Sequence, residues 1–150
     1  MEEELKQIQD ETISLLEKLG VSASVEVESA DEGMRVLLDT EENALLIGKH
    51  GNTLSSLEYV LTLLVAAKSG EFKRLQIEVG GYREEREAYL KELAERLKEE
   101  VISLGYEKKI HGLKPWERRL IHMYLGEDSA VMTESTGEDR DRVLIIKKRD

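Results

Sequence analysis

The stretch from Leu45 to Leu54 constrains this chain most, because it places a Gly-x-x-Gly loop between two apolar segments of helical character. Gly48 and Gly51 flank two residues, so the loop can approach a ligand backbone without interference from a Cβ atom. Asn52 and Thr53 are suitable N-cap residues for the helix that follows. That helix would direct its free N–H groups and the positive end of its dipole into the loop, which suits a phosphate group.

Two side chains inside the loop add to its chemistry. Lys49 is a mobile cation, and His50 carries an imidazole that can donate a hydrogen bond or stack. A Gly-x-x-Gly pattern alone is a weak signal, because turns contain it by chance, and a plain corner between two helices is the alternative. His50 is open in the same way, between a ligand contact and a solvated loop residue.

The distribution of charge along the chain matters more than its formal net charge of −10. Residues 1–32 hold two basic and ten acidic side chains, whereas residues 108–150 hold ten basic and eight acidic ones. A ligand responds mainly to charges within a Debye length of about 8 Å. The acidic total therefore does not exclude a nucleic-acid ligand.

Composition limits the chemistry and the cellular setting. The sequence has no cysteine, so it offers no disulfide framework and no cysteine-based metal site or nucleophile, in keeping with a reducing setting. Its first residues lack the basic and apolar regions of a signal peptide, and its most apolar run, residues 54–67, is too short to span a bilayer. We expect a cytoplasmic protein without a transmembrane segment.

Apolar periodicity in the first half predicts the order helix, strand, strand, helix, loop, helix, strand. The helices are predicted over residues 3–19, 41–47 and 52–68, and the strands over residues 21–28, 34–38 and 72–79. Thr40 is a possible N-cap of the second helix. The third helix is predicted to be largely buried along a broad apolar stripe of Leu54, Leu57, Val60, Leu61, Leu64 and Val65. A right-handed crossover through two helices would lay the last strand parallel to the strand before it.

Gly80 and Gly81 interrupt this pattern, and we expect them to separate a domain of residues 1–81 from one of residues 82–150. The second half is predicted to contain a long charged helix over residues 82–104, extended residues 108–113, a helix from Pro115 to its stop at Gly126, and extended stretches at residues 130–135 and 142–147. The apolar face of the shorter helix is predicted to hold Trp116, Leu120, Met123 and Tyr124. Arg118 and His122, four residues apart, share the opposite face.

Taken together, these segments resemble two known domains in a fixed order. The first, with its Ile47-Gly-x-x-Gly element, resembles a KH domain of the type II topology. Residues 114–122, followed by residues 133–137, look like the small domain named for its Arg-x-x-x-His motif. This order is similar to that of the bacterial Jag family, also called KhpB or SpoIIIJ-associated protein, and the likeness covers residues from about 35 to 147.

The resemblance implies an α+β fold in two parts. Residues 1–81 would form a KH domain of αββααβ order, with a mixed three-stranded sheet and its helices on one face. Residues 82–150 would form a small αβαββ domain. Many family members carry a further small domain ahead of the KH unit, and its functions are not expected from a sequence that begins at the KH region.

The resemblance also implies that the loop, residues 48–51, clamps the backbone of about four single-stranded nucleotides. Ile47 and Leu54 are candidates for the floor of a neighbouring groove that accepts bases. In the second domain, Arg118 offers a planar, permanently charged fork that matches phosphate or stacks on a base, beside the imidazole of His122. Arg119 is a secondary candidate, because it lies nearer the apolar edge of the helix.

A structural alternative applies to this pair too: His122 bonds a nearby backbone group, and Arg118 pairs with an acid. The residues that flank the motif match the family and favour the nucleic-acid interpretation: Pro115, Glu117, Ser135 and Gly137. Three scattered histidines make a metal site improbable, and we expect no cofactor.

The family is implicated in RNA binding and in the control of cell elongation, division or sporulation. We therefore expect a non-catalytic protein that binds single-stranded RNA, with single-stranded DNA as a related ligand, and that acts as a post-transcriptional regulator or RNA chaperone. The likeness also suggests a small KH-domain partner protein or a homodimer. The main alternative is a protein-interaction scaffold with little affinity for RNA. A hydrolase or nuclease is a third class, but no acid cluster for such chemistry accompanies either motif.

Overall fold

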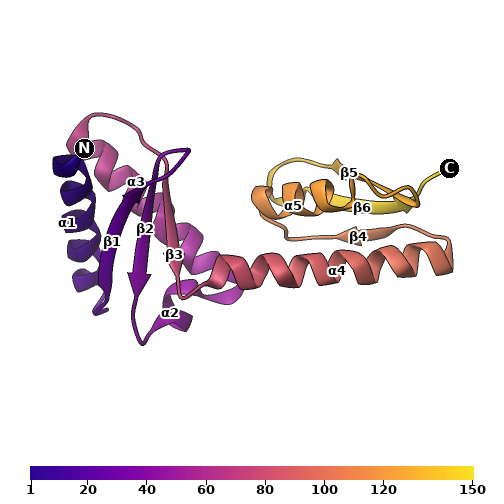
Figure 1. The fold of residues 1–150 in the computed structure, drawn as a ribbon, viewed down its shortest axis with the longest axis horizontal. Coiled ribbons are helices and arrows are strands. Elements are labelled where there is room, and N and C mark those ends of the chain that lie inside the picture. The colour runs from indigo at the N-terminus through magenta and orange to yellow at the C-terminus, as the bar shows by residue number, and fades with distance from the viewer. The chain divides into compact units, whose positions relative to one another are not determined.

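The computed structural model describes residues 1–150, which form two compact units, Met1–Arg83 and Glu84–Asp150. Each unit has its own hydrophobic core, and Figure 1 labels the helices and strands of both. The division falls close to Gly80 and Gly81, where the sequence predicts a boundary. No helix in either unit has the length and apolar character that a membrane-spanning helix requires.

The first unit has the predicted order of elements. These are α1 (Glu2–Lys18), β1 (Ser24–Ser29), β2 (Met34–Asp39), α2 (Asn43–Ile47), a short 3-10 turn (Lys49–Gly51), α3 (Asn52–Ser69) and β3 (Leu75–Val79). The three strands lie in the order β1-β2-β3, with β1 antiparallel to β2 and β2 parallel to β3. The predicted parallel pairing is therefore confirmed, with Val36 opposite Ile77.

One face of this sheet builds the core of the first unit. Every second residue of β2 and β3 is buried, as the two-residue period of a strand requires. α1 and α3 pack on this face, with Ile8 and Leu16 from α1 and Leu57 and Leu61 from α3 in the same core. The expected α+β fold, a mixed sheet with helices on one face, is thus observed.

Two predicted strands begin later than the apolar pattern suggests. Val21 is buried, but its N–H donates to the Leu16 carbonyl at 2.9 Å, so it closes α1 and takes no part in the sheet. Phe72 is 75% exposed in the loop that precedes β3. In both cases an apolar residue beside a strand was mistaken for part of it, because alternation alone cannot tell the two situations apart.

The prediction that α3 is largely buried is wrong. Its buried stripe consists of Leu54, Leu57, Leu61, Thr62 and Val65. A second apolar stripe on the same helix is exposed, and it consists of Tyr59, Val60, Leu63 and Leu64. A helix that is apolar all round is usually buried on every side, so α3 presents apolar surface that its own unit does not cover.

Glu58 on α3 covers the outer edge of the sheet. Its Oε2 accepts a hydrogen bond at 2.8 Å from the N–H of Ile77, which lies on the edge strand β3. Burial raises the pKa of Glu58 above its ordinary value of 4.5, while the Ile77 hydrogen bond and the charges of Arg83 and Arg74 act in the opposite direction. Ionised Glu58 is therefore less favourable in the folded protein than in the unfolded chain.

Replacement of Glu58 by glutamine should change how stability depends on pH. A carboxyl group whose pKa is raised by folding stabilises the protein below its unfolded-state pKa, and this contribution is lost as pH rises through the folded-state pKa. The glutamine would keep an oxygen for Ile77 but would not titrate. Denaturant unfolding between about pH 4 and pH 7.5 should show the wild type losing stability relative to Glu58→Gln as pH rises. A pH-independent difference, or the same trend for the exposed Glu41→Gln, would contradict the assignment.

The second unit also has the predicted order: helix, strand, helix, strand, strand. Its elements are α4 (Tyr82–Leu104), β4 (Lys108–Ile110), α5 (Pro115–Leu125), β5 (Val131–Thr136), a 3-10 turn (Asp139–Asp141) and β6 (Val143–Lys148). The strands form an antiparallel sheet in the order β4-β6-β5. Its core combines Leu90 and Val101 of α4, Ile121 of α5, and Leu144 and Ile146 of β6.

The predicted apolar face of α5 is partly wrong. Trp116 and Leu120 are half-buried and pack against the core, but Met123 is 70% exposed and Tyr124 is 40% exposed. The fully buried face consists of Glu117, Ile121 and Leu125. A pattern of apolar residues could not locate this face, because one of its members is a carboxylate.

Candidate nucleic-acid interface

The Gly-x-x-Gly loop requires both of its glycines for steric reasons. Gly48 has φ 70°, and a Cβ atom there would collide with the side chain of Thr53. Gly51 has φ 76°, and a Cβ atom there would lie 2.8 Å from the ring of Tyr82. His50 is also in the left-handed region, with φ 53°. The loop is therefore a specific backbone conformation, held against α3 and Tyr82.

The N-cap of α3 differs from the prediction. Asn52 and Thr53 were expected to cap the helix, but Gly51 occupies the N-cap position and no side-chain hydrogen bond caps the helix there. Asn52 already has helical dihedral angles, φ −66° and ψ −41°. The first turn of α3 thus follows the loop directly, and its N–H groups begin where an anion held by the loop would lie.

The other predicted residues of the first unit differ in their exposure. Lys49 and His50 are exposed, as a ligand contact requires. Ile47 is half-buried and packs on the core, whereas Leu54 is a core residue with 7% exposure and leaves little surface for a base. Leu45, which the sequence analysis did not single out as a contact, is 61% exposed on α2.

In the second unit, the buried carboxylate of Glu117 fixes the start of α5. It is 1% exposed, and its Oε1 accepts a hydrogen bond from the Lys114 N–H at 2.8 Å. Its Oε2 accepts a second hydrogen bond, at 2.6 Å, from Nε of Arg86 on α4. Burial lowers the pKa of the Lys114 ammonium group, with the charge of Glu117 acting against this effect and that of Arg86 adding to it. The charges around Glu117 thus join the first turn of α5 to α4.

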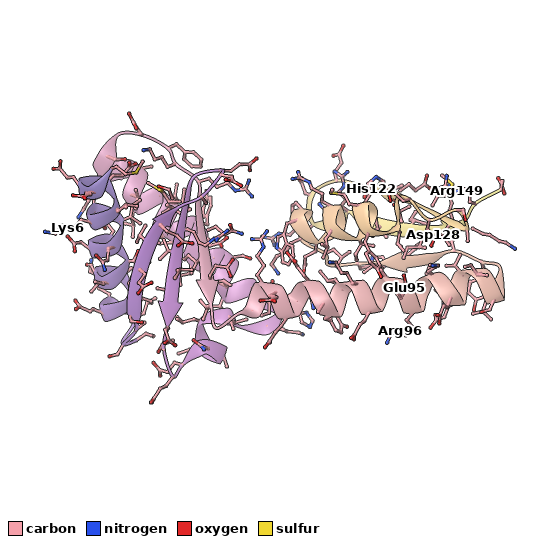
Figure 2. All side chains as sticks on the ribbon, viewed as in Figure 1. Lys6, Glu95, Arg96, His122, Asp128 and Arg149 are labelled. Atoms are coloured by element: carbon pink, nitrogen blue, oxygen red, sulfur yellow. The ribbon has the colours of Figure 1, made fainter.

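Arg118 and His122 each have a partner within the unit. Arg118 Nη1 donates to the Leu113 carbonyl at 2.5 Å, and His122 Nδ1 lies 2.5 Å from Thr133 Oγ1 (His122 is labelled in Figure 2). These partners differ from those of the structural alternative, in which Arg118 pairs with an acid and His122 bonds backbone. Both side chains are held in place, while His122 stays exposed and Arg118 half-exposed.

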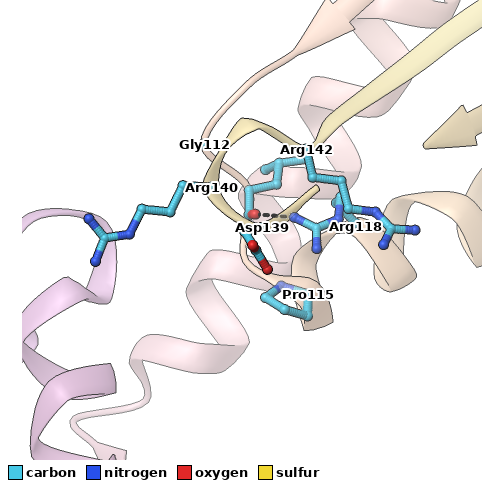
Figure 3. A pocket seen from close by; sticks show the side chains of 7 residues that line it. Gly112, Pro115, Arg118, Asp139, Arg140 and Arg142 are labelled. Atoms are coloured by element: carbon cyan, nitrogen blue, oxygen red, sulfur yellow. Dashed lines mark hydrogen bonds between the residues drawn. The ribbon is translucent and has the colours of Figure 1, made fainter. Parts of the chain in front are cut away.

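The structure brings the predicted residues of this unit to one hollow of about 470 Å³. It is lined by Pro115, Arg118, Arg119, His122, Ser135 and Arg142. A second hollow, of about 510 Å³, is lined by Gly112, Leu113, Pro115, Arg118, Asp139, Arg140 and Arg142 (Figure 3). Sequence analysis did not select Asp139, Arg140 or Arg142. The available signal was a run of alternating acids and arginines directly after Gly137.

Loss of the Glu117 carboxylate should destabilise the second unit strongly. Glu117→Ala would leave Arg86, whose side chain is 14% exposed, without its partner, and breaking a buried ion pair typically costs about 3–5 kcal/mol. Denaturant unfolding followed by circular dichroism should show this loss. Glu127→Ala, which removes an exposed carboxylate of the same unit, should change stability by less than about 0.5 kcal/mol. Equal effects of the two substitutions would contradict the structural role of Glu117.

The fold and the two sites define a class of protein in which a KH domain is followed by an Arg-x-x-x-His domain. Residues 6–79 match the family described as KhpA/KhpB, KH domain, and residues 88–148 match the family of the Arg-x-x-x-His domain. The chain belongs to the KhpB family, also called Jag.

Three curated relatives carry the name RNA-binding protein KhpB. The chain is 34% identical over 145 residues to the protein of Clostridium symbiosum, with 93% of this chain and 65% of the relative covered. It is 32% identical over 140 residues to that of Lactiplantibacillus plantarum, covering 93% and 44%. It is 28% identical over 138 residues to that of Bacillus subtilis, covering 91% and 66%. The chain thus spans about half to two-thirds of the length of these relatives.

Proposed function

We propose that this chain binds single-stranded RNA through the Gly-x-x-Gly loop and through the arginine and histidine face of α5, as a binding protein without catalytic activity. The observation that carries the proposal is the hollow of the second unit, where Arg118, Arg119, Arg142 and His122 meet at one surface. Guanidinium forks match phosphate geometry and stack on bases. The relatives named RNA-binding protein KhpB support the same ligand.

The loop supplies the second contact of the proposal. Gly48 and Gly51 leave the backbone free of Cβ atoms, and the exposed Lys49 and His50 lie between them. A phosphate there would meet backbone N–H groups, the first turn of α3 and a cation. Since both modules belong to one chain, binding of a strand by one raises its effective concentration at the other.

The cellular role that we propose is post-transcriptional regulation or RNA chaperoning in the cytoplasm, linked to cell elongation, division or sporulation. It rests on the family to which the chain belongs. Single-stranded DNA offers the same phosphates and base edges, so we expect weaker or comparable binding of that ligand.

We also propose a protein partner, either a small KH-domain protein or a second copy of this chain. The exposed apolar stripe of α3, Tyr59, Val60, Leu63 and Leu64, supports this, because contiguous apolar surface on a soluble domain marks interaction sites. The same stripe is what favours the competing function, a protein-interaction scaffold with little RNA affinity. Salt-dependent RNA binding separates the two functions.

Replacement of Lys49 and His50 by aspartate should remove most of the binding of an unstructured RNA. Both residues are exposed, so the fold should survive, with stability changed by less than about 0.5 kcal/mol per site. Fluorescence anisotropy would measure the affinity, and circular dichroism the fold. Lys49→Asp alone should weaken binding far more than Lys6→Asp, which reverses the same charge on the exposed side of α1 (Figure 2). Unchanged affinity in a folded double variant would exclude the loop from the site.

Binding should also weaken with salt in a predictable way. Contacts with Z phosphates release counterions and give a log–log slope of about −0.7Z for single strands. Three or four contacts, from Lys49, Arg118 and their neighbours, predict a slope of about −2 to −3, and Arg118→Ala should reduce its magnitude by roughly 0.7. A slope near zero, or an Arg118→Ala variant identical to the wild type at every salt concentration, would favour the scaffold function.

A further inference from the structure

The second hollow of the Arg-x-x-x-His unit lies outside the motif itself. Its walls come from three segments: Gly112 and Leu113 before α5, Pro115 and Arg118 on α5, and residues 139–142 in the β5–β6 connection. Its volume of about 510 Å³ falls within the range of roughly 300–1,000 Å³ that holds small ligands in proteins. The hollow therefore has the size of a nucleotide site.

Arg118 and Arg142 form a partition between the two hollows, since both residues, with Pro115, line each of them. Arg118 is held by the Leu113 carbonyl, a hydrogen bond drawn as a dashed line in Figure 3. Figure 3 shows the two guanidinium groups on the same side of the turn, while Arg140 extends away from them. Two adjacent arginines between two nucleotide-sized hollows suit a phosphodiester with one nucleoside on each side.

Asp139 gives the second hollow a different character from the first. Its carboxylate points into the hollow beside Pro115 (Figure 3), where it would repel a phosphate but would accept hydrogen bonds from the edge of a base. Guanine presents two neighbouring donors on its Watson–Crick edge, N1–H and the N2 amino group, and so pairs with both oxygens of one carboxylate. Uracil presents a single donor between two carbonyl acceptors, which a carboxylate repels.

The turn that carries Asp139 has a defined conformation. Asp139 itself has φ 51°, which aspartate tolerates better than most residues. Gly137 has φ 87°, and a Cβ atom there would lie 2.7 Å from the Asp141 carbonyl oxygen. The Asp141 N–H donates to the Glu138 carbonyl at 3.1 Å. Close approach within the turn thus presents the Asp139 side chain at the hollow.

We propose that this hollow is a base-binding subsite selective for guanine in single-stranded RNA, with Asp139 accepting from the Watson–Crick edge and Arg118 and Arg142 holding the adjoining phosphate. The ring of Pro115 offers an apolar surface to the base. The inference rests on the proposed function, because it assigns a base preference to a site that must first bind RNA.

The test measures binding of the full chain to uracil-rich RNA octamers that differ only in one central base, by fluorescence anisotropy. The wild type should bind the octamer with a central guanine about fivefold or more tighter than the all-uracil octamer. Asp139→Asn should lose this preference and bind the all-uracil octamer as well as, or slightly better than, the wild type, since a negative charge is removed. Asparagine also tolerates the left-handed region, so the turn should be kept.

Two control variants make the result specific. Glu127→Gln removes an exposed carboxylate outside both hollows and should leave the guanine preference intact. Arg142→Ala should weaken binding to every octamer and reduce the salt slope by roughly 0.7, whereas Arg96→Ala, on the exposed side of α4 (Figure 2), should leave binding nearly unchanged.

The possible failures are distinguishable. A wild type that binds all octamers equally, or an Asp139→Asn variant that keeps the guanine preference, would overturn the guanine subsite while RNA binding stands. Equal effects of Arg142→Ala and Arg96→Ala would remove the phosphate contact from the second hollow. A wild type that binds none of the octamers would overturn the proposed function itself, and the subsite with it.

Discussion

The Arg-x-x-x-His unit depends on the buried carboxylate of Glu117. Its two oxygens accept hydrogen bonds from the Lys114 N–H and from Arg86 Nε, so one side chain starts α5 and joins it to α4. A buried charge is tolerable only when its partners are in place, and this requirement leaves α5 little freedom to rotate. Arg118 is the next residue along the helix. Its direction towards Leu113 and the two hollows therefore follows from where Glu117 is held.

The KH unit depends instead on a steric constraint. Gly48 and Gly51 adopt positive φ angles and lie so close to Thr53 and Tyr82 that a Cβ atom at either position would collide with them. The same closeness delivers the loop to the start of α3 without a capping side chain. A conformation that only glycine tolerates thus produces an open backbone surface, on which Lys49 is the exposed cation.

The two sites use their charges differently, and this fits a division of labour in the proposed function. Lys49 is exposed on a flexible stem, a point charge that suits phosphate at any sequence. Arg118 and His122 are each held by a hydrogen bond and line a shaped hollow, so this module can favour one arrangement of phosphate and base over others. Contacts with phosphates position a strand, whereas contacts with base edges specify its sequence.

The sequence by itself determined the order of the elements, the parallel pairing of β2 and β3, and the local motifs of both sites. These follow from residue periodicity, from glycines that end or bend the chain, and from neighbours a few residues apart. Only the tertiary structure decided that Glu117 is buried against Arg86, that Glu58 covers the N–H of Ile77, and that one face of α3 stays exposed. It also decided that Asp139 and Arg142 join Arg118 at one hollow. Each of these depends on partners far away in the sequence, and a pattern of apolar and charged residues does not contain that distance.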